Sequence, residues 1–125
     1  MLEIRETELR DGYVEIVARA GKDGLRITEA FCGDRVTGFI AYRCGNDKTV
    51  IYDYDDGGDL QLCDGLVRSV LLKSCLRGID TAVFSFSDES KYSQLVKLGF
   101  VQNDCKTIEN LIEFMNSCEK CGENL

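Results

Sequence analysis

The acidic run that begins at Asp53 holds the side chains best suited to acid–base chemistry in this sequence. Asp53 and Asp55 stand at the expected end of a strand, and Asp56 and Asp59 follow in a glycine-containing loop. The chain has no histidine, so a general base must be a carboxylate, Tyr, Cys, Lys or a water held by the backbone. Asp53 and Asp55 are therefore the candidate catalytic bases, and a solvated acidic loop is the alternative interpretation.

The same run is similar to a calcium loop in composition only. The pattern D-x-[DN]-x-[DN]-G requires Asp or Asn at its fifth position, where this chain has Gly57, and a Glu at the twelfth position, which is absent. The sequence therefore predicts no metal at this loop.

Seven cysteines form the other reactive set. Cys118 and Cys121 have C-x-x-C spacing, but such a pair supplies only half of the ligands of a tetrahedral zinc site. Cys105 could add a third ligand, and no histidine exists to complete the set. We prefer reduced cysteines in an intracellular chain, with a metal or redox role for the tail as a remote alternative.

Length and charge limit the function classes. The chain has 125 residues, of which 44% are hydrophobic, enough for one domain with a single core. Its formal net charge of −7 repels phosphate backbones, which argues against non-specific nucleic-acid binding. No apolar run approaches the about 20 residues that span a bilayer, and no signal peptide is visible. We expect a single cytoplasmic domain over 1–125 that binds neither nucleic acid nor membranes.

Hydrophobic periodicity predicts a strand, a helix and three antiparallel strands in the first half of the chain. Residues 2–6 alternate as in a strand, and helical spacing runs from Thr7 to Ala20. Three further strands are predicted, joined by turns at 33–34 and 45–47, and they cover residues 25–32, 36–43 and 49–54.

The second half centres on a helix, a strand and a helix. Four apolar residues share one face of a helix expected over about 62–76: Leu66, Val67, Val70 and Leu71. Gly78 ends this helix, and a short apolar strand over 81–86 follows. Asp88 can cap a second helix, in which Gly99 supplies the left-handed C-terminal residue.

Helical spacing returns after Phe100, and Thr107 is a suitable N-cap. We therefore expect a helical tail over about 107–121. Leu72 and Leu76 lie one turn apart on the outer face of the central helix. We expect a second layer to cover them, formed by the tail helix or by a second copy in a homodimer.

This order of elements, together with GLVRSVL at 65–71 and KLGF at 97–100, resembles the GNAT N-acetyltransferase superfamily over residues 25–100. The resemblance implies an α+β fold with a mixed, mostly antiparallel sheet and a central helix after the fourth strand. It also implies direct transfer of an acetyl group from acetyl-CoA to the amine of a small molecule or peptide. Such a transfer needs no nucleophile on the enzyme, in agreement with the absence of histidine.

In the family, a Q/R-x-x-G-x-G/A loop opens the central helix, and its backbone N–H groups hold the pyrophosphate of acetyl-CoA. Aligning Gly65 with the first glycine assigns the cofactor contacts to five consecutive residues: Gly65, Leu66, Val67, Arg68 and Ser69. Asp88 aligns with a family Asn that contacts the cofactor, although an N-cap is its simpler role.

Three positions depart from the family pattern. Leu62 replaces Gln or Arg, and Val67 replaces the second small residue, so that a stiff side chain approaches any pyrophosphate. The family tyrosine that protonates the leaving thiolate aligns with Leu95, and Tyr92 lies on about the same helical face and could replace it. A core residue with a solvated hydroxyl is the other interpretation of Tyr92.

The family also has two helices between its first two strands, where this chain has room for one. The acceptor site is therefore open, completed by a dimer partner, or absent. The rival to an acetyltransferase is a degenerate scaffold that has lost catalysis and acts as a binding or dimerisation module.

Overall fold

The structure is a computed structural model that describes residues 2–8, 11–102 and 105–116. Its strands form one sheet in chain order: β1 (Leu2–Thr7), β2 (Arg26–Cys32), β3 (Arg35–Cys44), β4 (Thr49–Asp55), β5 (Ala82–Phe84) and β6 (Thr107–Ile108). Neighbouring strands are antiparallel except β4 and β5, which run parallel. The predicted α+β class with a mixed, mostly antiparallel sheet is confirmed.

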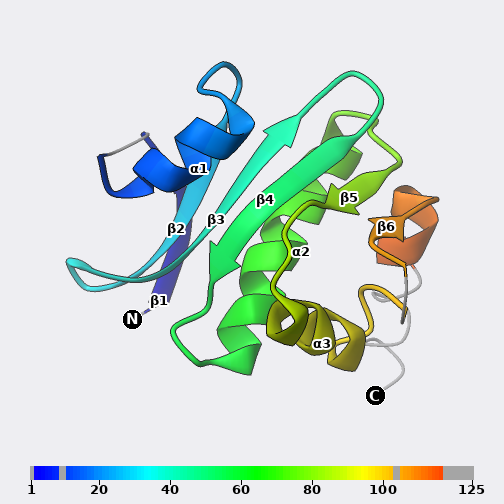
Figure 1. Cartoon of the computed structure of the whole chain (residues 1–125). Helices are drawn as coiled ribbons and strands as arrows, with labels where there is room; N and C mark the ends of the chain where they lie inside the picture. Colours follow the sequence, from blue (N-terminus) through cyan, green and yellow to red (C-terminus); the bar gives the residue numbers. More distant parts are fainter. Residues whose placement is uncertain (1, 9–10, 103–104, 117–125) are drawn as a thin grey trace.

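Helices cover both faces of this sheet (Figure 1). α1 (Val14–Ala20), preceded by the short helix η1 (Asp11–Tyr13), lies on one face, and α2 (Leu60–Leu76) crosses the other. The larger core forms between α2 and the sheet, and the smaller core lies under α1. The predicted start of the first helix at Thr7 is wrong, because Thr7 pairs with Ile27 as the last residue of β1.

The central helix starts earlier than predicted. Asp59 is its N-cap, and the Asp59 carboxylate accepts hydrogen bonds from the backbone N–H groups of Gln61 (2.9 Å) and Leu62 (3.3 Å). Since α2 begins at Leu60, Gly65 lies in its second turn. The helix ends as predicted before Gly78, which has a φ of 76°.

The prediction for α3 (Glu89–Lys97) is confirmed. The Asp88 carboxylate accepts the backbone N–H groups of Ser90 (2.9 Å) and Lys91 (3.3 Å), as an N-cap does. At the other end, Gly99 has a φ of 86°, and the N–H of the buried Phe100 bonds the carbonyl of Leu95.

The tail differs from its prediction. Thr107 is not an N-cap, because its backbone pairs with Val83 and adds β6 to the sheet. Within the described part of the tail, residues 111–116 are helical, and the N–H of Leu111 bonds the carbonyl of Asp80. Cys118 and Cys121 lie outside the described residues.

The outer face of α2 has no second layer in the described part of the chain. Leu72 is 48% exposed and Leu76 is 79% exposed, so residues 111–116 do not cover them.

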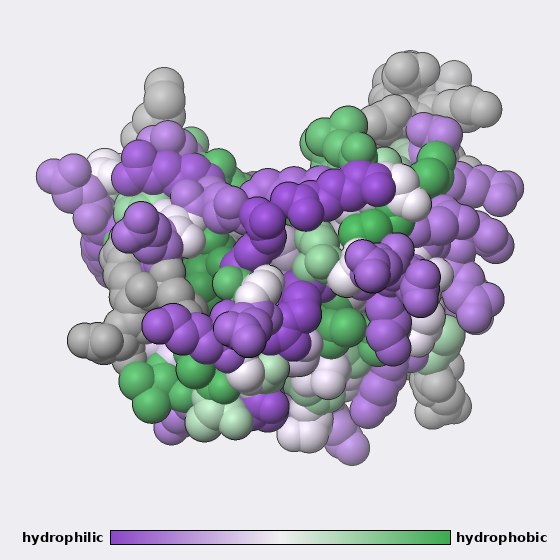
Figure 2. Space-filling view, turned by 90° about the horizontal axis from the view of Figure 1, so that it is seen from above, coloured by the Kyte–Doolittle hydropathy of each residue, from purple (hydrophilic) through white to green (hydrophobic). Residues whose placement is uncertain are grey.

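Figure 2 shows the visible face as mainly hydrophilic, with hydrophobic residues in separate patches. None of the described helices is long and apolar enough to cross a membrane.

Candidate functional site

β4 and β5 pair over only three positions and then separate. The last pair is Ile51 with Phe84, followed by a hydrogen bond from the N–H of Ser85 to the carbonyl of Ile51 (2.8 Å). The separation coincides with a β-bulge in β4, because Ala41 faces Asp53 while the next residue of β3 faces Ile51. We call the opening between residues 52–55 and 85–87 the fork. The two parallel strands therefore separate directly after Ile51.

Aromatic side chains close the fork on its α2 side. Tyr54 is 1% exposed, and its ring lies edge-on to Phe86, 5.7 Å between centroids. The Tyr54 hydroxyl donates to Oε1 of Gln94 (2.7 Å) and also lies 3.1 Å from the carbonyl oxygen of Lys91. Burial raises the pKa of Tyr54 far above its ordinary value, so this hydroxyl stays neutral. A strand and a helix are thus joined across the place where β4 and β5 separate.

An ion pair makes the second link. The ammonium of Lys91 lies 2.5 Å from Oδ1 of Asp53 and 5.5 Å from the centre of the Tyr54 ring. We call this ion pair and the Tyr54–Gln94 hydrogen bond the clasp. Asp53 is therefore not free to act as a base while the clasp is closed. Asp55, the other predicted base, is exposed at the end of β4 and accepts the N–H of Gly57 (2.9 Å).

The start of α2, which adjoins the fork, is acidic and already capped. Asp59 occupies the N–H groups of Gln61 and Leu62. Asp56 is 7% exposed, accepts the N–H of Gly58 with one oxygen, and has no hydrogen-bond partner for the other among the described residues. A pyrophosphate at this helix start would compete with Asp59 for the N–H groups and would be repelled by the charge of Asp56. With the cap in place, the start of α2 therefore does not fit a pyrophosphate.

The five residues predicted to hold the cofactor lie inside α2 and not at its N-terminus. Leu66 and Val67 are fully buried in the core. Ser69 donates to the carbonyl of Leu66, and Arg68 pairs with Asp64 at 2.9 Å. A Cβ added to Gly65 would lie 3.2 Å from Cδ1 of Ile4, so this glycine allows β1 to approach the helix. The alignment puts Gly65 in the loop before the central helix, whereas the structure has it in the second turn of α2. The role of these five residues in cofactor binding stays a prediction.

The Tyr92 side chain is held against β5 and the residues that follow it. Its hydroxyl donates to the carbonyl of Phe84 (2.6 Å) and accepts the N–H of Phe86 (3.4 Å), and its ring stacks on Phe86 at 4.5 Å. The Phe86 ring thus contacts both Tyr92 and Tyr54. Burial raises the pKa of Tyr92, which keeps its proton in place, and Leu95 at the family position is fully buried.

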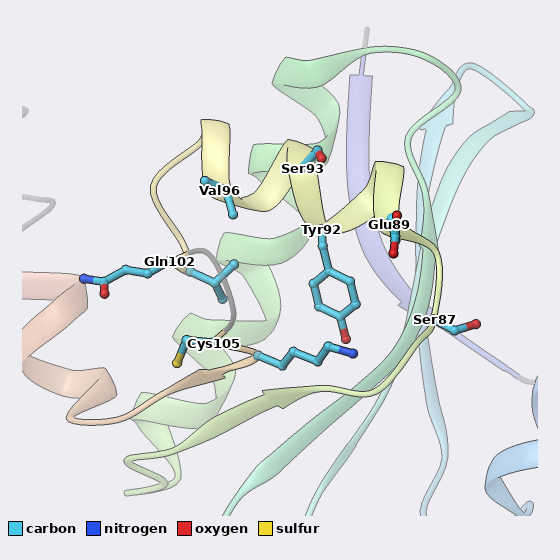
Figure 3. A pocket seen from close by; sticks show the side chains of 9 residues that line it. Ser87, Glu89, Tyr92, Ser93, Val96, Gln102 and Cys105 are labelled. Atoms are coloured by element: carbon cyan, nitrogen blue, oxygen red, sulfur yellow. The ribbon is translucent and has the colours of Figure 1, made fainter.

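Tyr92 also borders a cavity of about 400 Å³ between α3 and the segment before β6. Figure 3 shows the Tyr92 side chain extending from α3 toward β5, with Ser93 and Val96 on the same helix. Gln102 and Cys105 line the opposite side. Asp88, the last predicted cofactor residue, is the N-cap of α3, where Oδ1 accepts both capping hydrogen bonds.

Sequence reasoning missed Tyr54 and Lys91, which with Asp53 form most of the clasp. The sequence contained a local indication of Tyr54, because an aromatic residue between aspartates at a strand end is unusual in a loop that is fully solvated. Lys91 had none, because it is 38 residues away from Asp53 in the chain.

Comparison with solved structures identifies the class of fold. The ribosomal-protein-S18-alanine N-acetyltransferase of Escherichia coli superimposes with a TM-score of 0.62 at 15% identity, over 79% of this chain and 77% of that chain. A GNAT family acetyltransferase of Elizabethkingia anophelis with acetyl-CoA bound gives 0.62 at 12% identity, over 79% and 74%. The PaiA N-acetyltransferase of Thermoplasma acidophilum in complex with coenzyme A gives 0.61 at 13%, over 79% and 89%.

The chain therefore has the fold of the GNAT acetyltransferases, as the sequence predicted. No protein-family model matches the sequence, and no curated protein matches it at a significant level. TM-scores of 0.61–0.62 establish the shared fold, and identities of only 12–15% leave the activity to be argued from the site.

Proposed function

We propose that the protein is an N-acetyltransferase that transfers an acetyl group from acetyl-CoA directly to an amine. The fork is the observation that carries this proposal. It combines parallel β4 and β5, a bulge at their point of separation, and a helix that follows β4 directly. Solved structures with this fold hold acetyl-CoA or coenzyme A.

The clasp must open before the fork can admit a cofactor, because Tyr54 and Phe86 now fill it. Opening breaks the ion pair between Asp53 and Lys91 and releases both charges beside the fork. Bound acetyl-CoA would supply the activated acetyl group. The released Asp53 carboxylate is our first candidate to accept the proton of an acceptor ammonium, and Asp55 is the second candidate for that role.

Tyr92 remains the candidate proton donor. Its raised pKa keeps the phenol neutral, which is the form that can donate. Its hydroxyl is now committed to the backbone of β5, so donation requires that the hydroxyl exchange its Phe84 partner for another acceptor.

The test is binding of acetyl-CoA and CoA, measured by calorimetry and by the change in melting temperature, together with an acetyl-transfer assay on a panel of amines. We expect dissociation constants in the micromolar to millimolar range. The closed clasp weakens binding, because the apparent affinity falls in proportion to the small fraction of molecules in the open state. Lys91→Gln, which removes the ion pair, should bind CoA more tightly than wild type. Lys97→Gln, with the same charge change at the far end of α3, is the matched control.

A second candidate function is favoured by the filled fork and the capped start of α2. A scaffold without catalysis that binds a partner would keep this fold and would have no need of an open fork. The exposed Leu72 and Leu76 on α2 offer such a module an apolar contact. If neither wild type nor the Lys91→Gln variant binds CoA, the acetyltransferase proposal is rejected and this candidate replaces it.

A further inference from the structure

A second groove lies on the face of β5 that is turned away from α2. Phe84 and Phe86 point into the main core, and alternation along an extended chain directs Ser85 and Ser87 to the opposite face. The groove over these serines has a volume of about 410 Å³, and Arg19 of α1, Tyr92 of α3 and Lys106 also line it. Ser87 also lines the neighbouring cavity, and in Figure 3 its side chain extends away from Tyr92.

This groove is basic in an acidic protein. Arg19 and Lys106 are its charged lining residues, and no acidic residue lines it among those described. The Arg19 guanidinium donates to the carbonyl of Tyr52, and the Lys106 ammonium lies 4.7 Å from the centre of the Tyr92 ring. No carboxylate of the described residues forms a salt bridge with either side chain. Glu89 lines the neighbouring cavity and not this one. Because the whole chain has a formal net charge of −7, a groove lined by two cations and no carboxylate differs in sign from the chain as a whole.

The groove also supplies neutral donors. Ser85 and Ser87 are exposed, and their hydroxyl groups can donate beside the two cations. Guanidinium, ammonium and hydroxyl donors together suit the oxygens of a carboxylate or a phosphate group. The set combines two positive charges with no competing carboxylate, which selects an anion over a cation.

The position of the groove links it to the fork. Ser85 is the residue at which β5 leaves β4, and its N–H still bonds Ile51. Arg19 bonds the carbonyl of Tyr52, the bulged residue immediately before Asp53. An anion between Arg19 and Lys106 would therefore lie next to the fork, and an ammonium group on the same molecule could reach toward Asp53.

We propose that this groove binds the anionic group of the acceptor, so that the substrate is an amine that also carries a carboxylate or a phosphate. The assignment rests on the proposed acetyltransferase function, with Asp53 serving the ammonium end and Arg19 with Lys106 serving the anionic end. A simple cationic amine lacks the group that this groove is built to hold.

The experiment follows the backbone amides of Ser85 and Ser87 by ¹⁵N NMR during titration, in the absence of acyl-CoA. The probes are β-alanine and O-phosphoethanolamine, compared with ethylamine, which has no anionic group. We expect β-alanine or O-phosphoethanolamine to shift these amides and ethylamine to leave them unchanged. The two anionic arms decide between carboxylate and phosphate.

Lys106→Gln should weaken binding of the preferred probe about fivefold, the effect of one charge contact near a surface. Lys97→Gln should leave the affinity unchanged, and the amide spectrum of each variant reports whether it is folded. The proposal is overturned if neither anionic probe binds, if ethylamine binds equally well, or if Lys106→Gln has no effect.

Failure of this inference is separable from failure of the proposed function. Acetyl transfer to amines without an anionic group would reject the groove assignment and keep the acetyltransferase. Binding of an anionic probe without any CoA binding would keep the groove as an anion site and reject the transferase.

Discussion

Lys91 and Asp53 form an ion pair, 2.5 Å between Nζ and Oδ1, that joins the start of α3 to β4 across the fork. The two side chains are 26% and 25% exposed, so the pair is partly shielded from water. A pair of this kind contributes about 1 kcal/mol at most, and solvent screening reduces that value. The ion pair is therefore weak enough to open at a small cost in free energy.

Asp53→Asn should separate binding from catalysis. The substitution weakens the clasp and removes a negative charge beside the fork, so the Kd for CoA should fall about fivefold. If Asp53 is the base, kcat should fall by about 100-fold or more in the same variant. Calorimetry and a steady-state assay measure the two effects.

Asp55→Asn is the control, since it removes the same charge from the end of β4 without touching the clasp. Equal effects of the two substitutions on CoA affinity would mean that the clasp plays no part and that only the total charge matters.

The N-cap of α2 gives a second, graded prediction. Asn at position 59 keeps the cap without the charge, whereas Gly frees the N–H groups of Gln61 and Leu62 at a cost of only a few tenths of a kcal/mol. Affinity for CoA should therefore increase from wild type to Asp59→Asn and further to Asp59→Gly. Urea denaturation checks that the free energy of unfolding changes little.

An Asp59→Gly variant that binds CoA no better than Asp59→Asn would indicate that the freed amides do not receive the pyrophosphate. The cofactor would then have to bind by other contacts or not at all.

Local patterns predicted α3 well and the tail poorly. The N-cap at Asp88 and the left-handed Gly99 depend on residues next to them in the chain, so a sequence pattern contains the needed information. Thr107 has an equally good N-cap pattern, but pairing with Val83 places it in β6. That pairing is a long-range contact, and it overrides the local preference.

The candidate site was only partly predictable for the same reason. The acidic run was visible, and Asp53 and Asp55 lie at the end of β4 as predicted. The alignment of Gly65 with a loop glycine misplaced that residue, because the first turn of α2 already begins at Leu60, with Asp59 as its cap. The clasp joins residues 38 apart, and no spacing rule relates them.

Gly65 and Gly38 give a matched pair of alanine substitutions. An added Cβ at Gly65 would lie 3.2 Å from the flexible end of Ile4, and Ala is favoured over Gly in a helix by about 1 kcal/mol. Gly65→Ala should therefore leave the stability unchanged or raise it by up to about 1 kcal/mol. An added Cβ at Gly38 would lie 2.5 Å from the backbone oxygen of Asp55, so Gly38→Ala should destabilise by about 1–3 kcal/mol.

The same pair tests the cofactor role of Gly65. We expect Gly65→Ala to bind CoA as wild type does, because position 65 is inside the helix. A tenfold loss of affinity with an unchanged melting temperature would restore Gly65 to the cofactor site.

The cap of α3 predicts a pH dependence of stability. Hydrogen bonds from Ser90, and then from the N–H of Lys91, lower the pKa of Asp88 in the folded protein. A lowered folded-state pKa means that the stabilisation is fully present above the unfolded value of about 3.9 and is lost as the pH falls below it. Asp88→Asn retains a capping side chain but does not titrate. Urea midpoints of wild type and variant should therefore differ near neutral pH, in favour of wild type, and the difference should disappear as the pH falls through the lowered pKa of Asp88. A difference that stays constant over this pH range would show that the charge of Asp88 does not contribute to the cap.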